Sequence, residues 1–253
     1  MNNPIHSASA DAIQPKKKTT YYHLVLDRSG SMSSCWSEVR EVIDNQLLDL
    51  KRVQEENASS ELIFSFCAFD NALRFSQALM PVIQARMDWE LIYPNGSTSL
   101  NDAIGESISY IKEKVGPALS EADADVVMLI LTDGYENSSR TYSAKAVKEL
   151  MEACEETGKW NFLFLGAGLD VTEVTQAYDR GDKNAYSFGK DSLAMSFNKV
   201  NSELEDYVKQ KEQNQKKSSF FKFQWCFIPI QVGHLGFGVG SDGFDSTLVA
   251  KGD

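Results

Sequence analysis

The stretch His23–Met32, HLVLDRSGSM, is the part of the sequence that decides the fold. It joins a short apolar run, Leu24–Leu26, to a polar loop that starts at Asp27. A second stretch, Val126–Gly134 (VVMLILTDG), repeats this arrangement with a longer apolar run. Short unbroken apolar runs are typical of strands that are buried on both faces of a parallel sheet. We therefore predict a sheet covered by helices on both sides, with polar loops at the ends of two strands.

The remaining apolar runs alternate with helical segments along the chain. Further strands are predicted over 62–69, 73–76, 160–165 and 185–188. Apolar residues at spacings of three and four predict helices over 36–50, 104–115, 147–154 and 193–207. Gly158 is placed to end the third of these helices. The alternation predicts an α/β fold, with a doubly wound, mostly parallel open sheet, helices on both faces and one antiparallel edge strand.

The two ends of the chain differ from this regular region. Residues 1–19 lack apolar periodicity and are predicted to form a disordered arm, followed by one domain over 20–212. Residues 213–253 are predicted to be a polar linker and an aromatic, glycine-rich tail, whose structure the pattern leaves undefined. This tail contains too many glycines and polar residues for a membrane span.

Composition and charge restrict the function. The chain has 253 residues, with 36 Asp and Glu against 25 Lys and Arg, and a formal net charge of −11. Nucleic acids and anionic membranes select basic surfaces, so we expect neither as the partner. Three His and four Cys without a C-x-x-C pair argue against a zinc enzyme or a disulfide scaffold. Because no secretory signal is recognisable either, we expect a reducing, cytoplasmic location.

Three polar clusters lie at or beside strand ends. Asp27–Met32 follows the first strand, Gly96–Leu100 precedes a helix, and Thr132–Gly134 follows the most apolar strand. Ligands of open α/β sheets bind beyond the carboxyl ends of the strands, so we expect these clusters to meet there. They offer two carboxylates and several hydroxyls, which suit Mg²⁺ or Mn²⁺ better than zinc or copper. A divalent cation would relieve the repulsion between the carboxylates, and its incomplete shell would accept an acidic ligand.

Each cluster also has a purely structural interpretation. Ser31, Ser33 or Ser34, in or just after the first cluster, could cap the helix that follows them. Ser99 and Asp102 have the spacing of a capping box, and Asp133-Gly134 alone is an ordinary turn. The presence of all three clusters at strand or helix junctions in one fold favours the binding site.

The combination of these motifs resembles the von Willebrand factor type A (vWA) family. The matching segments are HLVLDRSGSM (His23–Met32), GSTSLNDAI (Gly96–Ile104) and LILTDGYEN (Leu129–Asn137). They resemble the three parts of the family's metal-ion-dependent adhesion site, in the same order and separation. The strand and helix pattern agrees from about residue 20 to 210. The D-x-S-G-S-M form resembles the intracellular bacterial members of the family.

The resemblance implies an intact metal site with a role for each residue. It implies that Ser29 and Ser31 bind the metal directly through their hydroxyls, and that Asp27 holds it mainly through water. Thr98 would bind directly or through water, and Asp133 through water. A carboxylate from a partner protein would complete the octahedron, and in some members this exchange is coupled to movement of the last helix. The resemblance implies a protein-binding module that is not an enzyme, in settings such as chelatase-type ATPases and stress or tellurite-resistance systems.

The main alternative is a Mg²⁺-dependent phosphatase or phosphotransferase that uses Asp27 as nucleophile. Haloacid-dehalogenase-type enzymes carry D-x-D after the first strand, and here Ser29 stands where the second carboxylate would transfer protons. The sequence also lacks the G-x-x-x-x-G-K-[ST] motif of nucleotide binding and the G-x-S-x-G motif of serine hydrolases. We therefore expect a docking module, with the enzyme as the alternative.

Overall fold

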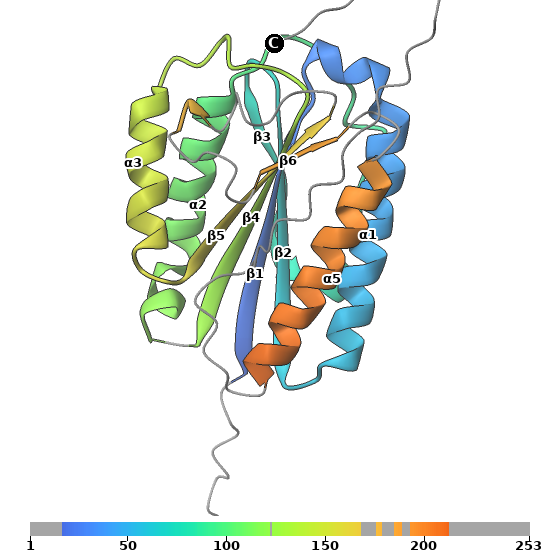
Figure 1. Ribbon diagram of the computed structural model, residues 1–253, viewed down its shortest axis with the longest axis vertical. Helices are drawn as coiled ribbons and strands as arrows, with labels where there is room; N and C mark the ends of the chain where they lie inside the picture. The colour runs from blue at the N-terminus through green and yellow to red at the C-terminus, as the bar shows by residue number, and fades with distance from the viewer. Residues whose placement is uncertain (1–16, 122, 168–175, 179–184, 189–192, 213–253) are drawn as a thin grey trace, which may run out of the picture. The chain divides into compact units, whose positions relative to one another are not determined.

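The computed structural model describes residues 17–121, 123–167, 176–178, 185–188 and 193–212. These residues form a six-stranded sheet with the strand order β3-β2-β1-β4-β5-β6 (Figure 1). The predictions for residues 1–16 and 213–253 lie outside the described residues. The strands are β1 (Lys18–Asp27), β2 (Ser60–Phe69), β3 (Leu73–Pro81), β4 (Ala124–Thr132), β5 (Trp160–Ala167) and β6 (Ala185–Phe188).

Strand pairing confirms the predicted fold class. β1 lies at the centre and pairs in parallel with β2 and β4, while β5 continues the parallel order to β6. β3 pairs with β2 in the antiparallel direction and forms the other edge. β1 begins at Lys18, inside the range predicted for the arm, because Lys18 and Thr19 pair with Ser60 and Glu61 of β2.

Within the described residues, four α-helices connect or follow the strands, as the apolar spacing predicts. They are α1 (Trp36–Glu56), α2 (Leu100–Glu121), α3 (Ala144–Glu155) and α5 (Leu193–Glu212), with short 3-10 helices η1 (Gly30–Ser34) and η2 (Val82–Gln84). Several helices run past their predicted ends; α1 continues to Glu56, and its extension includes Val53, which is buried three residues after Leu50. Gly158 adopts a φ of +67° just beyond α3, which confirms its predicted role as a helix stop.

The sheet is the middle layer of three. On β4, Val127, Leu129 and Leu131 belong to the core shared with α1 and α5. The intervening residues, Val126, Met128 and Ile130, belong to the core shared with α2 and α3. Figure 1 shows the two helix pairs on opposite faces of the sheet. Every residue of β4 is buried, as predicted for a strand covered on both sides. Among the described helices, none is long and apolar enough to cross a membrane.

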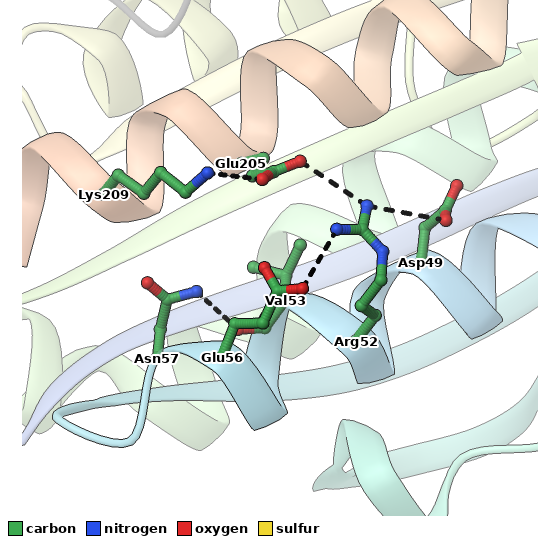
Figure 2. Close-up of polar contacts among 7 residues, drawn as sticks. All are labelled: Asp49, Arg52, Val53, Glu56, Asn57, Glu205 and Lys209. Carbon is green, nitrogen blue, oxygen red and sulfur yellow. Dashed lines mark hydrogen bonds and ion pairs between the residues drawn. The ribbon is translucent and has the colours of Figure 1, made fainter.

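Charged side chains link α1 and α5 along their exposed edge (Figure 2). Arg52 of α1 contacts Glu205 of α5, with 3.5 Å between Nη2 and Oε2. Arg52 also pairs with Asp49 and Glu56 of its own helix, and Lys209 pairs with Glu205. These groups lie at the helix surface, whereas the apolar face of α5 packs against the core.

A buried hydrogen bond joins the packed side of α5 to β4. Val200, Leu204 and Tyr207 are buried in the core shared with α1. The Tyr207 hydroxyl donates to Asp125 Oδ2 over 2.6 Å, which ties α5 to the start of β4. Burial raises the pKa of Tyr207 well above its usual value, so the hydroxyl stays a donor at neutral pH.

Candidate metal centre

Asp27 is the last residue of the central strand β1, and its side chain is fully buried. The Ser29 amide donates to Asp27 Oδ1 over 2.7 Å. The Thr132 hydroxyl, at the end of β4, donates to Oδ2 over 2.6 Å. Because both oxygens accept hydrogen bonds from different strand ends, the carboxylate is held in a fixed orientation.

Burial raises the pKa of Asp27 to about 6. The hydrogen bonds from Thr132 and Ser29 act against this rise, and the negative charge of Asp133 adds to it. The charged form of Asp27 is therefore disfavoured by its surroundings. A cation beside the two carboxylates would remove that penalty.

The serines of the loop after β1 connect Asp27 to Asp133. Ser29 Oγ and Ser31 Oγ lie 3.0 Å apart. The Ser31 hydroxyl donates to Asp133 Oδ1 over 2.6 Å, so the loop after β1 contacts the loop after β4. Ser29 is buried, whereas Ser31 is exposed and Asp133 is half-buried. The group is thus closed on its inner side and open to solvent on its outer side.

Gly134 lies close to Thr98, Ser31 and Asp27, which come from two other segments of the site. A Cβ atom added at Gly134 would lie 2.9 Å from Thr98 Oγ1, 3.5 Å from Ser31 Oγ and 3.7 Å from Asp27 Oδ2. The structure therefore brings the five predicted site residues together around one small space. Only glycine at this position leaves that space open.

The backbone of Thr98 is held by the segment that follows β4. The Thr98 amide donates to Asn137 Oδ1 over 3.0 Å, and the Asn137 and Ser138 amides donate to the Thr98 carbonyl. The Glu136 carboxylate accepts from the Asn101 amide in the first turn of α2 over 2.7 Å. These contacts fix the position of Thr98 at the entrance to α2.

The side chains of the polar clusters do not act as the helix caps that the alternative interpretation predicts. The Asp102 carboxylate accepts from the amides of Arg140, Thr141 and Tyr142, so it joins the segment after β4 to α2 and forms no capping box with Ser99. Helix α1 begins after Cys35, whose side chain makes no capping hydrogen bond. The hydroxyls of the first cluster therefore remain directed toward the site or toward solvent.

The donor set and its spacing fit a small, hard cation. Among the described residues, no three His, Cys, Asp or Glu side chains gather as a metal site, so hydroxyls make up most of this candidate. In an octahedron with metal–oxygen bonds of about 2.1 Å, adjacent ligand oxygens lie about 3.0 Å apart. The 3.0 Å between Ser29 Oγ and Ser31 Oγ equals this spacing. Hydroxyl and carboxylate oxygens are also the donors that Mg²⁺ and Mn²⁺ accept.

Sequence reasoning did not assign a site role to three neighbouring residues. The sequence places Thr132 in the third polar cluster but indicates no role for its hydroxyl, which holds Asp27 directly. Arg28 and Asp70 form a buried ion pair beside the site. Asp70 follows the strand over 62–69, so its place at a carboxyl strand end was the signal that could have identified it.

By sequence, the chain matches no protein-family model and no curated protein. Its structure matches solved structures at low sequence identity. One is the vWF domain of the type V pili tip protein Mfa5 from Porphyromonas gingivalis, with a TM-score of 0.57 and 9% identity. That match covers 77% of this chain and 97% of the Mfa5 chain.

Two further structures share the fold. The pilus adhesin SpaC from Lactobacillus rhamnosus GG, in an open conformation, matches with a TM-score of 0.58 and 13% identity, over 77% of this chain and 31% of SpaC. The conserved hypothetical protein BatB from Bacteroides thetaiotaomicron matches with a TM-score of 0.50 and 12% identity, over 75% of this chain and 99% of BatB. Together with the strand order, these likenesses show that the chain has the fold of a vWA domain.

Proposed function

We propose that this protein is a metal-dependent docking module that binds an acidic side chain of a partner protein through Mg²⁺ or Mn²⁺. Ser29, Ser31 and Thr98 would hold the cation, with Asp27 and Asp133 acting through water. The observation that carries the proposal is the meeting of three chain segments around the space beside Gly134. The cation would supply a positive centre that an acidic ligand can enter.

The charge of the protein supports the need for a cation. The chain carries a net charge of −11, and two of its acids, Asp27 and Asp133, interact electrostatically at the candidate site. Without a cation, a partner carboxylate approaching Asp27 and Asp133 would be repelled. A divalent ion reverses the sign of the local field and turns the same site into an acceptor for acidic groups.

The exposed rim of the site offers surface for a protein partner. Tyr93 is 60% exposed and lies beside Arg28, whose guanidinium carbon is 5.8 Å from the Tyr93 ring centre. Tyr135 follows Gly134 in the chain and is 48% exposed. Tyrosine is enriched at protein interfaces because it combines an apolar ring with a hydrogen-bonding group.

The enzymatic alternative is less well supported by the geometry. A nucleophile must be reachable by the substrate, and the Asp27 side chain is fully buried. Both of its carboxylate oxygens also accept hydrogen bonds, from Ser29 and Thr132. The residue two positions on, Ser29, is no proton donor or acceptor near neutral pH. A Mg²⁺-dependent phosphatase or phosphotransferase therefore stays the second candidate.

The setting of the interaction stays a prediction. Two of the structural neighbours are, by name, a pilus tip protein and a pilus adhesin, which is compatible with a binding role. The cytoplasmic location and the ATPase or stress-response setting are expectations from the sequence alone. At such low sequence identity, the structural neighbours support the fold but do not decide between these settings.

Thermal unfolding with and without metal tests the proposal. In Mg²⁺ or Mn²⁺ the melting temperature should rise, because a ligand at 100 times its Kd stabilises the folded state by about 2.7 kcal/mol. Asp27→Asn and Ser29→Ala should abolish this shift. The matched control is Ser33→Ala, which removes an exposed hydroxyl from the same loop and should respond like the parent. An equal response of all four proteins would contradict the site.

A binding experiment and an activity assay then separate docking from catalysis. A partner should be retained on the immobilised protein in Mg²⁺, released by chelator and lost with Asp27→Asn. Hydrolysis of p-nitrophenyl phosphate in Mg²⁺ that disappears with Asp27→Asn would instead favour the phosphatase.

A further inference from the structure

Arg28 lies between two of the candidate ligands in sequence and contacts two other segments. Its amide donates to the Phe69 carbonyl at the end of β2, and its carbonyl accepts from the Asn95 amide over 2.7 Å. Its guanidinium is buried and donates to the Tyr93 carbonyl over 3.3 Å. One residue therefore joins the loop after β1 to the end of β2 and to residues 93–95.

Asp70 continues this connection toward Thr98. Its Oδ2 pairs with Arg28 Nη2 over 2.5 Å, and its Oδ1 accepts from the Ala72 amide. Its carbonyl accepts from the Ser99 amide over 2.9 Å, next to Thr98 in the chain. Arg28 and Asp70 thus form an unbroken path of contacts from the Ser29 loop to Thr98.

Stability alone gives a weak reason for this pair. The side chains of Arg28 and Asp70 are only 7% and 6% exposed, and the loss of hydration can exceed the attraction in such a pair. Among the described residues, Arg28 Nε finds no hydrogen-bond acceptor, which adds to the cost of burial. An apolar pair could fill the same space at no loss of stability.

We propose that the Arg28–Asp70 ion pair is a clamp that positions the Ser29 loop and Thr98 against each other for the cation. This inference rests on the proposed metal-binding function. Arg28 and Asp70 are positioning residues: they fix the two segments whose hydroxyls would bind the ion. A second contact joins the same segments, because the Gly30 amide donates to the Gly96 carbonyl over 3.0 Å. The side-chain pair adds to the backbone hydrogen bond between the Arg28 amide and the Phe69 carbonyl, and it ties the Ser29 loop to Asp70, whose carbonyl holds the Ser99 amide.

The pair also keeps positive charge from opposing the metal. Arg28 alone beside the site would repel a divalent cation, and Asp70 neutralises it. Removing Asp70 alone therefore changes both geometry and charge. Removing both side chains together keeps the local charge balanced and isolates the geometric effect.

Mn²⁺ titration of three variants tests the clamp. Arg28→Met/Asp70→Leu removes both charges while keeping apolar volume, and Arg28→Lys keeps a charge pair but loses the planar fork that serves Asp70 and Tyr93 separately. Arg52→Gln/Glu205→Gln is the control, because it removes an arginine–carboxylate pair on the helix surface. The readouts are the Mn²⁺ affinity and, in chelator, the hydrogen exchange of the Asn95 and Ser99 amides.

The clamp predicts weaker Mn²⁺ binding, by about tenfold or more, in Arg28→Met/Asp70→Leu, with faster exchange at Asn95 and Ser99. Arg28→Lys should lose affinity in the same direction, and it decides the question if the double variant does not fold. The control should match the parent. Unchanged exchange and affinity within about twofold of the parent would overturn the clamp. A parent protein that binds no Mn²⁺ overturns the proposed function, and the exchange measurement still decides the clamp.

Discussion

Two arginine–carboxylate pairs in this protein have the same chemistry but opposite surroundings. Arg28 and Asp70 meet beside the candidate metal centre, where their side chains are 7% and 6% exposed. Arg52 and Glu205 meet across α1 and α5, where their side chains are 48% and 22% exposed (Figure 2). Water and salt screen the charges of Arg52 and Glu205. Arg28 and Asp70 are buried, so each charge is balanced by the other.

The contrast between the two pairs shows where a charged pair affects the stability of this fold. The exposed pair belongs to a network that includes neighbours three and four residues apart on α1, and such pairs contribute little. The buried pair joins residues 42 positions apart and lies next to Asp27, the most deeply buried acid of the site. We therefore expect substitutions at the strand ends to have large effects and substitutions at the helix edge to have small ones.

Asp70→Asn should give the largest loss of stability. It leaves the Arg28 guanidinium buried without its carboxylate, which costs about 3–5 kcal/mol in the free energy of unfolding. Urea unfolding in chelator measures this without any contribution from metal. Glu205→Gln is the matched control and should unfold close to the parent. Equal losses for the two variants would show that burial does not separate the two pairs.

The buried residue His23 should make stability depend on pH. Burial lowers its pKa to about 3, and its Nδ1 lies 2.7 Å from Ser65 Oγ. The unfolded chain takes up a proton on His23 near pH 6.5 and the folded chain does not, so this contribution to stability is lost as pH falls from about 6.5 toward 3. Between pH 7 and 5 the loss is about 2 kcal/mol.

His23→Asn tests this dependence, because its amide reaches the position of Nδ1 and does not titrate. The variant should lose less stability than the parent between pH 7 and 5, whatever its stability at pH 7. Parallel pH curves for the two proteins would contradict a neutral, buried His23. The exposed acids of the helix edge contribute to both curves equally.

The helix pair itself offers the smallest effects and an internal comparison. Tyr207→Phe removes the buried hydrogen bond to Asp125 and should cost about 1–2 kcal/mol. Arg52→Gln removes the exposed ion pair between α1 and α5 and should move the melting temperature by no more than about 2 °C. Calorimetry of both variants in the same buffer checks the order. A larger effect from Arg52 would mean that the surface network holds α5 in place.

The fold was predictable because its signals are local. The apolar run Val126–Leu131 gives a strand buried on both sides, and the spacing from Trp36 to Leu50 gives one face of α1. Asp27 and Asp133 were identified because they follow such runs, and the topology then brings parallel strand ends together. Helix ends were less predictable: on α1, Val53 continues the apolar spacing three residues after Leu50, but the residues around it up to Glu56 are polar.

The contacts that complete the site were not predictable from local pattern. Arg28 and Asp70 are 42 residues apart, and no periodicity links them. Asp102 has the spacing of a capping box, but its carboxylate binds the amides of 140–142, which only the folded chain brings near. Such pairings depend on how two loops pack, and single-sequence spacing does not record that.

Anomalous diffraction from crystals grown with Mn²⁺ tests the proposed metal centre most directly. We expect one peak beside Gly134, at bonding distance from both Ser29 Oγ and Ser31 Oγ, with Asp27 and Asp133 one water molecule away. Crystals of Asp27→Asn grown in the same way should lack the peak. A Mn²⁺ peak only elsewhere in the protein, or the same peak in Asp27→Asn, would contradict a cation site built from these residues.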